Sequence, residues 1–156
     1  MNPSKTRDHG GDLDDAVARF GGARADWIDL STGINTVPFP VAGLARGIWS
    51  TLPDKNAQDR LENAARSFWN IPSGAAVLAA PGASSLIARI PALTPPGTVQ
   101  IATPTYNEHA AAFATCGWQV SPNFGDALVV VHPNNPDGKL WSATDRPARL
   151  TIIDES

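Results

Sequence analysis

Hydrophobic positions in the first 70 residues recur at helical spacing. Leu13, Val17 and Phe20 place apolar side chains on one face of a short helix, which Gly21-Gly22 ends. A second apolar stripe runs from Leu61 to Phe68. The elements predicted for this part of the chain are helices over 12–20, 41–50 and 57–70, a short strand over 27–30 and a loop over 31–40.

After Pro72 the pattern changes to short, uninterrupted apolar runs that alternate with helical segments. The predicted elements are a strand over 75–79, a helix over 83–90, a strand over 98–102, a helix over 107–115, and strands over 118–120, 128–131 and 150–154. Apolar strands without polar alternation indicate a mostly parallel sheet covered on both faces. Because such sheets bind ligands at the carboxyl ends of their strands, functional residues are expected directly after the strands.

The last predicted strand is followed by very little sequence. The chain ends at Ile152-Ile153-Asp154-Glu155-Ser156, and a parallel sheet whose last strand lacks a covering helix is incomplete. We therefore expect a fragment of an α/β domain.

Composition and charge restrict the possible function classes. Of the 156 residues, 42% are hydrophobic and 17% are charged, which is typical of a globular domain. The formal net charge of −3 argues against a nucleic-acid or anionic-membrane surface. No apolar run approaches the roughly 20 residues of a membrane-spanning helix, and the polar start at Met1–Lys5 differs from a signal peptide. Together with the single cysteine, Cys116, these features favour a cytoplasmic protein.

Two segments that follow predicted strands could contact an anion or a planar ring. Pro81-Gly82-Ala83-Ser84-Ser85 opens a helix, whose free N–H groups attract anions. The alternative is an ordinary N-cap in which Ser84 or Ser85 satisfies the first turn. Tyr106, the only tyrosine, offers a ring for stacking; the alternative is a half-buried tyrosine with a hydrated hydroxyl.

Two further strand ends carry polar side chains. The segment His132-Pro133-Asn134-Asn135-Pro136-Asp137-Gly138 is either a plain turn or a pair of amide donors for a ligand oxygen. Asp154 ends the last apolar strand, where a carboxylate is costly to bury without a partner. It is either exposed at the sheet edge or paired with a cationic ligand nitrogen.

Other site chemistries lack support in the sequence. His9, His109 and His132 show no metal-ligand spacing with one another or with Cys116, so no metal site is expected. A nucleophile elbow is absent, as are the GxGxxG and GxxxxGK[ST] phosphate-binding motifs.

Taken in order, four motifs resemble those of fold-type I pyridoxal-phosphate (PLP) enzymes. They are Gly82-Ala83-Ser84, Pro104-Thr105-Tyr106, Asn134-Asn135-Pro136-Asp137-Gly138 and Asp154-Glu155. They are similar to those of the histidinol-phosphate aminotransferase group, whose pattern contains N-N-P-T-G and D-E-A-[YF]. The resemblance implies a fold-type I PLP-transferase: an incomplete large domain with a mostly parallel sheet in an α/β/α arrangement, preceded by an N-terminal arm.

The same resemblance implies PLP as the cofactor and assigns residues to it. The amides of Ala83 and Ser84 would hold the phosphate, and Tyr106 would stack on the pyridine ring. Asn135 would donate to the phenolic oxygen of the ring. Asp154 would pair with the protonated pyridine nitrogen and keep the ring an electron sink.

The opening of the chain narrows the resemblance. His9-Gly10-Gly11 and the segment Asp29–Asn35 are similar to H-G-G and D-[FL]-S-x-x-I-N of the threonine-phosphate decarboxylase family of cobalamin biosynthesis. Glu108-His109 resembles the E-[YH] of that family, and the likeness extends over residues 8–156. It implies that His9 and Asn35 face the substrate; the alternatives are a frayed N-terminal histidine and a turn-forming asparagine.

The likeness also suggests how the chain is divided. We expect 1–45 to form an N-terminal arm and substrate-side segment. We expect 46–156 to form the N-terminal part of the PLP-binding large domain.

Three departures from the family pattern bear on activity. Leu52 stands where many relatives have a tyrosine that reaches the cofactor phosphate of the neighbouring subunit, and leucine cannot donate that hydrogen bond. Asp137 replaces the threonine of N-N-P-T-G. The Schiff-base lysine of the family and the arginines that bind its substrate fall beyond Asp154. The lysines present are all upstream of that position: Lys5, Lys55 and Lys139.

The expected function is therefore that of the family. It is PLP-dependent decarboxylation of L-threonine O-3-phosphate to (R)-1-aminopropan-2-yl phosphate in cobalamin (vitamin B12) biosynthesis, with the fragment alone inactive. One alternative is a histidinol-phosphate-type aminotransferase, against which the H-G-G opening argues. Another is a non-catalytic, truncated remnant. The expected partners are a small phosphorylated amino-acid substrate and, for the full-length protein, a second copy in a homodimer, with no nucleic acid and no membrane.

Overall fold

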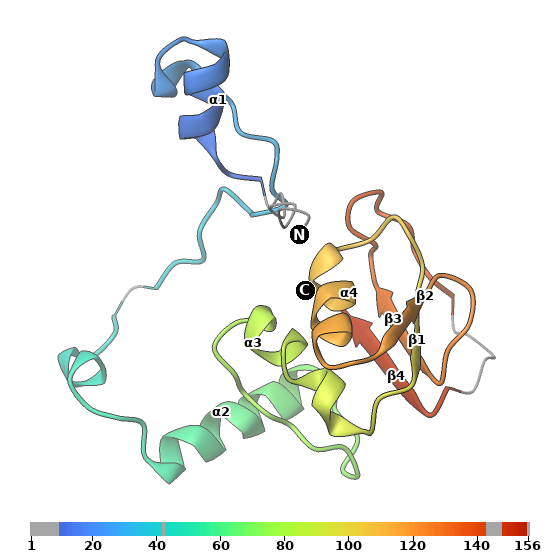
Figure 1. The fold of residues 1–156 in the computed structure, drawn as a ribbon. Helices are drawn as coiled ribbons and strands as arrows, with labels where there is room; N and C mark the ends of the chain where they lie inside the picture. The colour runs from blue at the N-terminus through green and yellow to red at the C-terminus, as the bar shows by residue number, and fades with distance from the viewer. Residues whose placement is uncertain (1–9, 42, 143–147, 156) are drawn as a thin grey trace. The chain divides into compact units, whose positions relative to one another are not determined.

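The computed structural model describes residues 10–41, 43–142 and 148–155, and the chain divides into two compact units, Met1–Pro53 and Asp54–Ser156 (Figure 1). In the first unit, α1 (Leu13–Phe20) begins at Asp12, whose Oδ1 accepts a hydrogen bond from the Asp15 N–H at 3.0 Å. This confirms the helix predicted over 12–20. Two short 3₁₀ helices follow, η1 (Arg24–Asp26) and η2 (Arg46–Trp49).

Two predictions for the first unit are wrong. The strand predicted over 27–30 does not form, because a strand needs a neighbour to pair with, and this segment has none among the described residues. Ile28 and Leu30 are instead 83% and 87% exposed. The helix predicted over 41–50 reduces to η2, because Gly43 has a φ of 81° and therefore cannot continue a right-handed helix.

Helices open the second unit. α2 (Lys55–Phe68) begins at Asp54, whose Oδ1 accepts from the Ala57 N–H at 2.7 Å; it confirms the prediction over 57–70 with both ends shifted by two residues. The helix predicted over 83–90 is shorter than expected, forming α3 (Ala83–Ile87), and η3 (Ile90–Leu93) follows it with Pro91 in its first turn. None of the described helices is both long enough and apolar enough to cross a membrane.

The strand predicted over 75–79 is also wrong. The segment is largely exposed and pairs with no described strand. Instead, the Arg66 guanidinium donates to the carbonyl of Ala75, the first residue of this segment, at 2.9 Å and to that of Pro72, which precedes the segment, at 3.2 Å. α3 is therefore entered from an irregular segment.

A parallel sheet forms the centre of the second unit. Its strands and one helix follow along the chain as β1 (Thr98–Ile101), α4 (Asn107–Thr115), β2 (Gln119–Ser121), β3 (Ala127–Val131) and β4 (Leu150–Asp154). In the sheet the strands lie in the order β2-β1-β3-β4, and every neighbouring pair is parallel. The register places Val131 of β3 beside Asp154 of β4. The predicted α/β class with a parallel sheet is confirmed.

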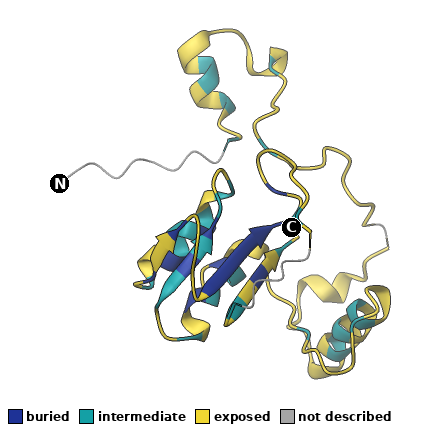
Figure 2. Ribbon diagram, turned by 90° about the vertical axis from the view of Figure 1, so that its right-hand side faces the viewer, coloured by how far each residue is buried: buried dark blue, intermediate teal, exposed yellow. Residues whose placement is uncertain are grey.

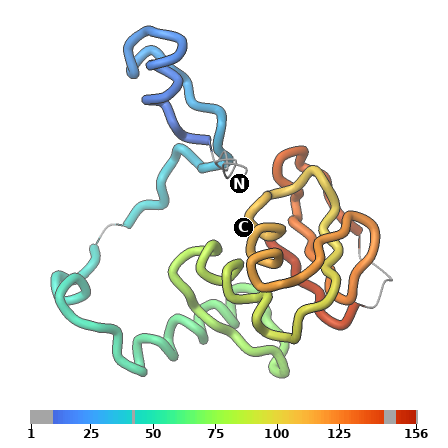
Figure 3. The backbone as a smooth tube through the Cα atoms, in the orientation of Figure 1, coloured from blue at the N-terminus to red at the C-terminus, as the bar shows by residue number. Residues whose placement is uncertain are grey.

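The core lies between this sheet and α4. Phe113 of α4 is 1% exposed and meets Trp118 edge to face, with ring centroids 5.1 Å apart. Both pack against apolar strand residues, and the cluster comprises Val99, Ile101, Phe113, Trp118, Ala127, Val129 and Ile152. Figure 2 shows the buried residues gathered on the strands, and Figure 3 shows the backbone of α4 beside the strands.

Candidate functional site

Three strands deliver the predicted residues to one edge of the sheet. β1, β3 and β4 are neighbours and run in the same direction, so their carboxyl ends meet. The segment after β1 leads to Tyr106, the segment after β3 contains Asn135, and β4 ends at Asp154. The placement expected from the strand pattern is therefore what the fold produces.

Asp154 is held in place by a buried histidine. Its Oδ2 lies 2.7 Å from Nε2 of His109, which is 1% exposed, while the Asp154 side chain is 10% exposed. Since an ionised carboxylate can only accept, Nε2 carries the proton in this hydrogen bond. Of the two alternatives, exposure at the sheet edge is excluded: the carboxylate is largely buried and paired, but with a protein side chain.

Tyr106 belongs to the same cluster. It is half-buried at the start of α4, and its ring meets His109 edge to face, with the centroids 6.3 Å apart and the planes at 84°. His109 thus connects two predicted residues that are 48 positions apart. The sequence feature that indicates this role for His109 is its position three residues after Tyr106, because residues three apart on a helix share a face.

The two adjacent asparagines have different environments. Asn135 is exposed, whereas Asn134 is buried and its amide donates to Pro104 O at 3.0 Å and to Asp137 Oδ1 at 2.7 Å. Only Asn135 therefore fits the predicted role of an amide that faces a ligand. Asn134 fits the alternative, a residue of the turn itself.

Ala83 and Ser84 lie in the first turn of α3, and both are exposed. The N-cap is Gly82 and no side chain caps this end; the Ser85 hydroxyl donates to the Gly82 carbonyl at 2.7 Å. Neither serine therefore takes the capping role considered as the alternative. α3 packs beside α4 in the same unit.

The predicted substrate-side residues belong to the first unit. His9 lies outside the described residues. Asn35 is exposed, and its Oδ1 accepts from the Val37 N–H at 2.9 Å, which is the turn-forming geometry considered as its alternative.

The two opening motifs do contact each other within the first unit. The Gly11 N–H donates to Ser31 Oγ at 2.6 Å, and the Ser31 hydroxyl donates to Asp29 Oδ1 at 2.6 Å. A side chain at Gly10, where φ is 67°, would overlap the Ser31 backbone, so glycine is needed there. A hollow of about 480 Å³ lies between the segments Gly10–Ala16 and Trp27–Ser31.

The departures from the family pattern can be located in the structure. Leu52 is 92% exposed. The Lys55 ammonium pairs with Asp59 at 2.6 Å, and the Lys139 ammonium lies 4.1 Å from the centroid of the Trp141 ring. Lys5 lies outside the described residues.

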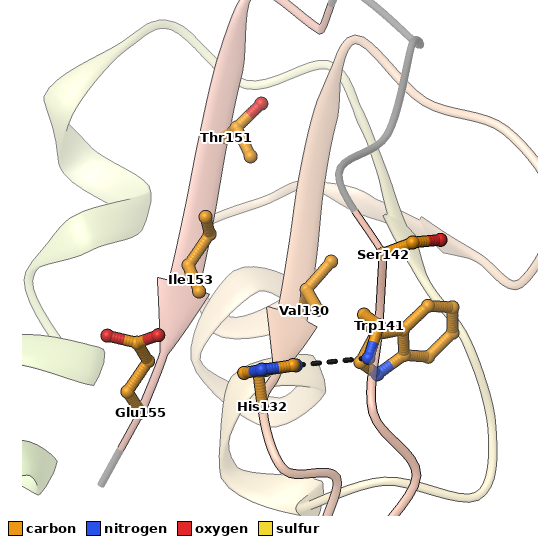
Figure 4. A pocket seen from close by; sticks show the side chains of 7 residues that line it. All are labelled: Val130, His132, Trp141, Ser142, Thr151, Ile153 and Glu155. Carbon is orange, nitrogen blue, oxygen red and sulfur yellow. Dashed lines mark hydrogen bonds between the residues drawn. The ribbon is translucent and has the colours of Figure 1, made fainter.

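A separate depression of about 220 Å³ lies against β3 and β4 (Figure 4). It contains none of the predicted site residues. His132 borders it, and its Nδ1 accepts from the Trp141 N–H at 3.0 Å, so the two sides of the loop after β3 are joined there. The side chains around it are Val130, His132, Trp141, Ser142, Thr151, Ile153 and Glu155.

Among the described residues, no group of three or more His, Cys, Asp or Glu is placed to hold a metal ion.

Comparison with known proteins identifies similar sequences. No family model matches the chain. It is 37% identical over 155 residues to a threonine-phosphate decarboxylase from Sinorhizobium sp., covering 93% of this chain and 45% of the relative. It is 34% identical over 148 residues to a threonine-phosphate decarboxylase from Pseudomonas aeruginosa, covering 88% of this chain and 43% of the relative. The chain thus spans less than half the length of these curated relatives, and the resemblance seen in its motifs is confirmed.

Proposed function

We propose, from the relationship of this chain to the threonine-phosphate decarboxylases, that it supplies the PLP-binding edge of such an enzyme. The observation that carries the proposal is the cluster of Tyr106, His109 and Asp154 at the carboxyl end of the sheet. A largely buried carboxylate held by His109, which also contacts the Tyr106 ring, suits a planar cofactor that carries a protonated ring nitrogen.

The side chains present fit PLP chemically. Asp154 offers an acceptor of fixed position, because His109 holds one of its oxygens at 2.7 Å. Asn135 offers an exposed amide on the loop after β3. The first turn of α3 offers the N–H groups of Ala83 and Ser84 without a side-chain cap, which suits a phosphate. When bound, PLP supplies an electron sink for charge that develops at the substrate Cα.

Each residue then has a defined task. Asp154 would hold the proton at the pyridine nitrogen, and His109 would fix the carboxylate by donating from Nε2. Tyr106 would stack on the ring and exclude water from it. Asn135 would donate to the phenolic oxygen, and the α3 amides would hold the phosphate. On the substrate side, we assign His9 and Asn35 to contacts with the phosphorylated amino acid.

The proposed substrate is L-threonine O-3-phosphate, and the proposed product is (R)-1-aminopropan-2-yl phosphate for cobalamin biosynthesis. We further propose a cytoplasmic enzyme that acts as a homodimer when joined to the remaining sequence of its relatives. Decarboxylation and transamination differ in which bond at the substrate Cα is broken, so the residues that would orient the substrate decide between them.

Cofactor binding is tested on this chain by PLP titration followed by absorbance and tryptophan fluorescence. Asp154→Asn removes the charge but keeps an acceptor for His109, so the fold is preserved. We expect its Kd for PLP to rise at least about tenfold, because the pyridinium loses its counter-charge. The matched control is Glu155→Gln, the exposed neighbouring carboxylate, whose Kd should stay within about twofold. Equal affinities of Asp154→Asn and the unaltered chain would overturn the assignment.

The reaction is tested after fusing this chain to the remaining sequence of the Sinorhizobium relative. Release of CO2 from L-threonine O-3-phosphate is expected. Turnover that requires a keto acid and releases no CO2 would instead support an aminotransferase.

A further inference from the structure

Asn134 joins the two loops that lead to Tyr106 and Asn135. It sits in the loop after β3 and is 4% exposed. Its side chain makes two hydrogen bonds to the loop after β1: Nδ2 donates to Pro104 O at 3.0 Å, and Oδ1 accepts from the Thr105 hydroxyl at 2.6 Å. One side chain therefore bridges residues 30 and 29 positions away in the sequence.

The contacts of Asn134 require one orientation of its amide. Pro104 O and the Asp137 carboxylate are acceptors and must face the NH₂ group, while the Thr105 hydroxyl can donate to the oxygen. Turning the amide over would place its oxygen against both acceptors. The network thus fixes the side chain of Asn134 and, through it, the separation of the two loops.

Asp137 closes the same loop from the other side. Its Oδ1 accepts from Asn134 Nδ2 at 2.7 Å and from the Lys139 N–H at 3.1 Å. The main chain adds hydrogen bonds from the Gly138 N–H to Asn134 O at 2.6 Å and from the Asn134 N–H to Lys139 O at 2.8 Å. The Asn134 side chain is also the main reason why the pKa of Asp137 lies below its ordinary value.

Apolar packing contributes little to holding these loops. Pro104 and Asn135 are exposed, and so are Pro136 and Gly138. The hydrogen bonds that join the two loops therefore centre on Asn134. Because Tyr106 follows Thr105 and Asn135 follows Asn134 directly, the network constrains the backbone of both.

We propose that Asn134 is a positioning residue that holds Tyr106 and Asn135 at a fixed separation, and that Asp137 orients the Asn134 amide for this task. That this separation matters for ligand binding rests on the proposed function. The bridge itself is a property of the two loops and can be measured without a ligand.

Tyr106 provides the readout, because the chain has one tyrosine and ¹³C-tyrosine labelling gives one set of ring signals. Asn134→Ala should shift and broaden these signals at temperatures far below unfolding. Asn123→Ala, an exposed asparagine in the loop between β2 and β3, is the matched control and should leave them in place. Thr105→Val removes one arm of the bridge while keeping the side-chain shape, and serves if Asn134→Ala does not fold. Asp137→Asn retains an acceptor oxygen and should behave like the unaltered chain, whereas Asp137→Ala should resemble Asn134→Ala.

PLP titration of the same variants links the bridge to binding. We expect Kd to rise about tenfold for Asn134→Ala and Asp137→Ala, with recovery in Asp137→Asn. Unchanged Tyr106 signals in Asn134→Ala and Thr105→Val would overturn the positioning role. Altered Tyr106 signals in a chain that binds no PLP would contradict the proposed function and leave the bridge supported.

Discussion

The sheet of the second unit and the whole of the first unit use their apolar residues in opposite ways. In the sheet, Val99, Ile101 and Val129 are at most 4% exposed and pack against α4. Among the described residues of the first unit none is buried, and α1 keeps both of its faces at least partly exposed. Both regions contain many apolar residues, but only one of them encloses a core.

The same difference applies to the residues proposed for the cofactor and to those proposed for the substrate. Tyr106 and Asp154, which we propose for the cofactor, lie next to His109, which contacts both of them. Asn35, which we propose for the substrate, lies on a segment held by local hydrogen bonds. We infer that cofactor binding can be preorganised within this chain. In the first unit, by contrast, large apolar side chains such as Ile34 and Phe39 are exposed.

Truncation of a phenylalanine in each region should give the largest contrast. Phe113→Ala removes a buried ring that packs on Trp118, and should lower the free energy of unfolding by about 3–5 kcal/mol. Phe39→Ala removes a ring that is 84% exposed and should change it by less than about 0.5 kcal/mol. Urea unfolding followed by far-UV circular dichroism measures both. A loss of similar size in the two variants would remove the contrast.

Glycine substitutions should give a smaller contrast of the same kind. A Cβ at Gly125, which precedes β3, would lie 2.7 Å from Ala127 O and 2.8 Å from Thr98 O, and neither backbone group can retreat without distorting the sheet. Gly125→Ala should therefore cost about 1–3 kcal/mol of unfolding free energy. At Gly47 in η2, a Cβ would meet nothing within 4 Å, so Gly47→Ala should be neutral or stabilising by up to about 1 kcal/mol. Thermal unfolding distinguishes the two, and a harmless Gly125→Ala would show that β1 and β3 can separate.

The elements that face the core were predicted closely, and so was α1, although none of its residues is buried. α4 has the predicted ends, and β3 and β4 differ from their predictions by at most one residue. The segments 27–30 and 75–79 have the same apolar composition as strands, but strand formation depends on a neighbouring strand, which composition alone does not reveal. Periodicity also overestimated the helix at 41–50, where the positive φ of Gly43 decides the backbone.

The candidate site shows the same limit. Its place at the strand ends followed from the alternation of strands and helices, because parallel strands end at one edge. The pairing of His109 with Asp154 spans 45 positions, so it depends on the register of β4 and on how α4 packs. Adjacent asparagines likewise look equivalent in sequence, and only the fold distinguishes the buried Asn134 from the exposed Asn135.

The smallest effect concerns a carboxylate in each region. Hydrogen bonds from the Ser31 hydroxyl and then the Ser31 N–H lower the pKa of Asp29 below its ordinary value of 3.8. Since the pKa is lower in the folded chain, these bonds stabilise it fully above the ordinary value, and their contribution is lost as the pH falls through the lowered pKa. Ser31→Ala removes the larger cause, so the pKa of Asp29 should rise toward 3.8. The pKa of Asp137, which is lowered mainly by Asn134, should not change.

Carboxyl ¹³C shifts recorded by NMR against pH measure both groups in one sample. Because the Ser31 hydroxyl also accepts from the Gly11 N–H, the variant should release the contact between the two opening motifs as well. If Asp29 keeps its lowered pKa in Ser31→Ala, the Ser31 side chain does not organise this segment. A shift at both Asp29 and Asp137 would show that the two regions respond as one. A shift at Asp29 alone means that the first unit is ordered by its own hydrogen bonds, independently of the packed sheet.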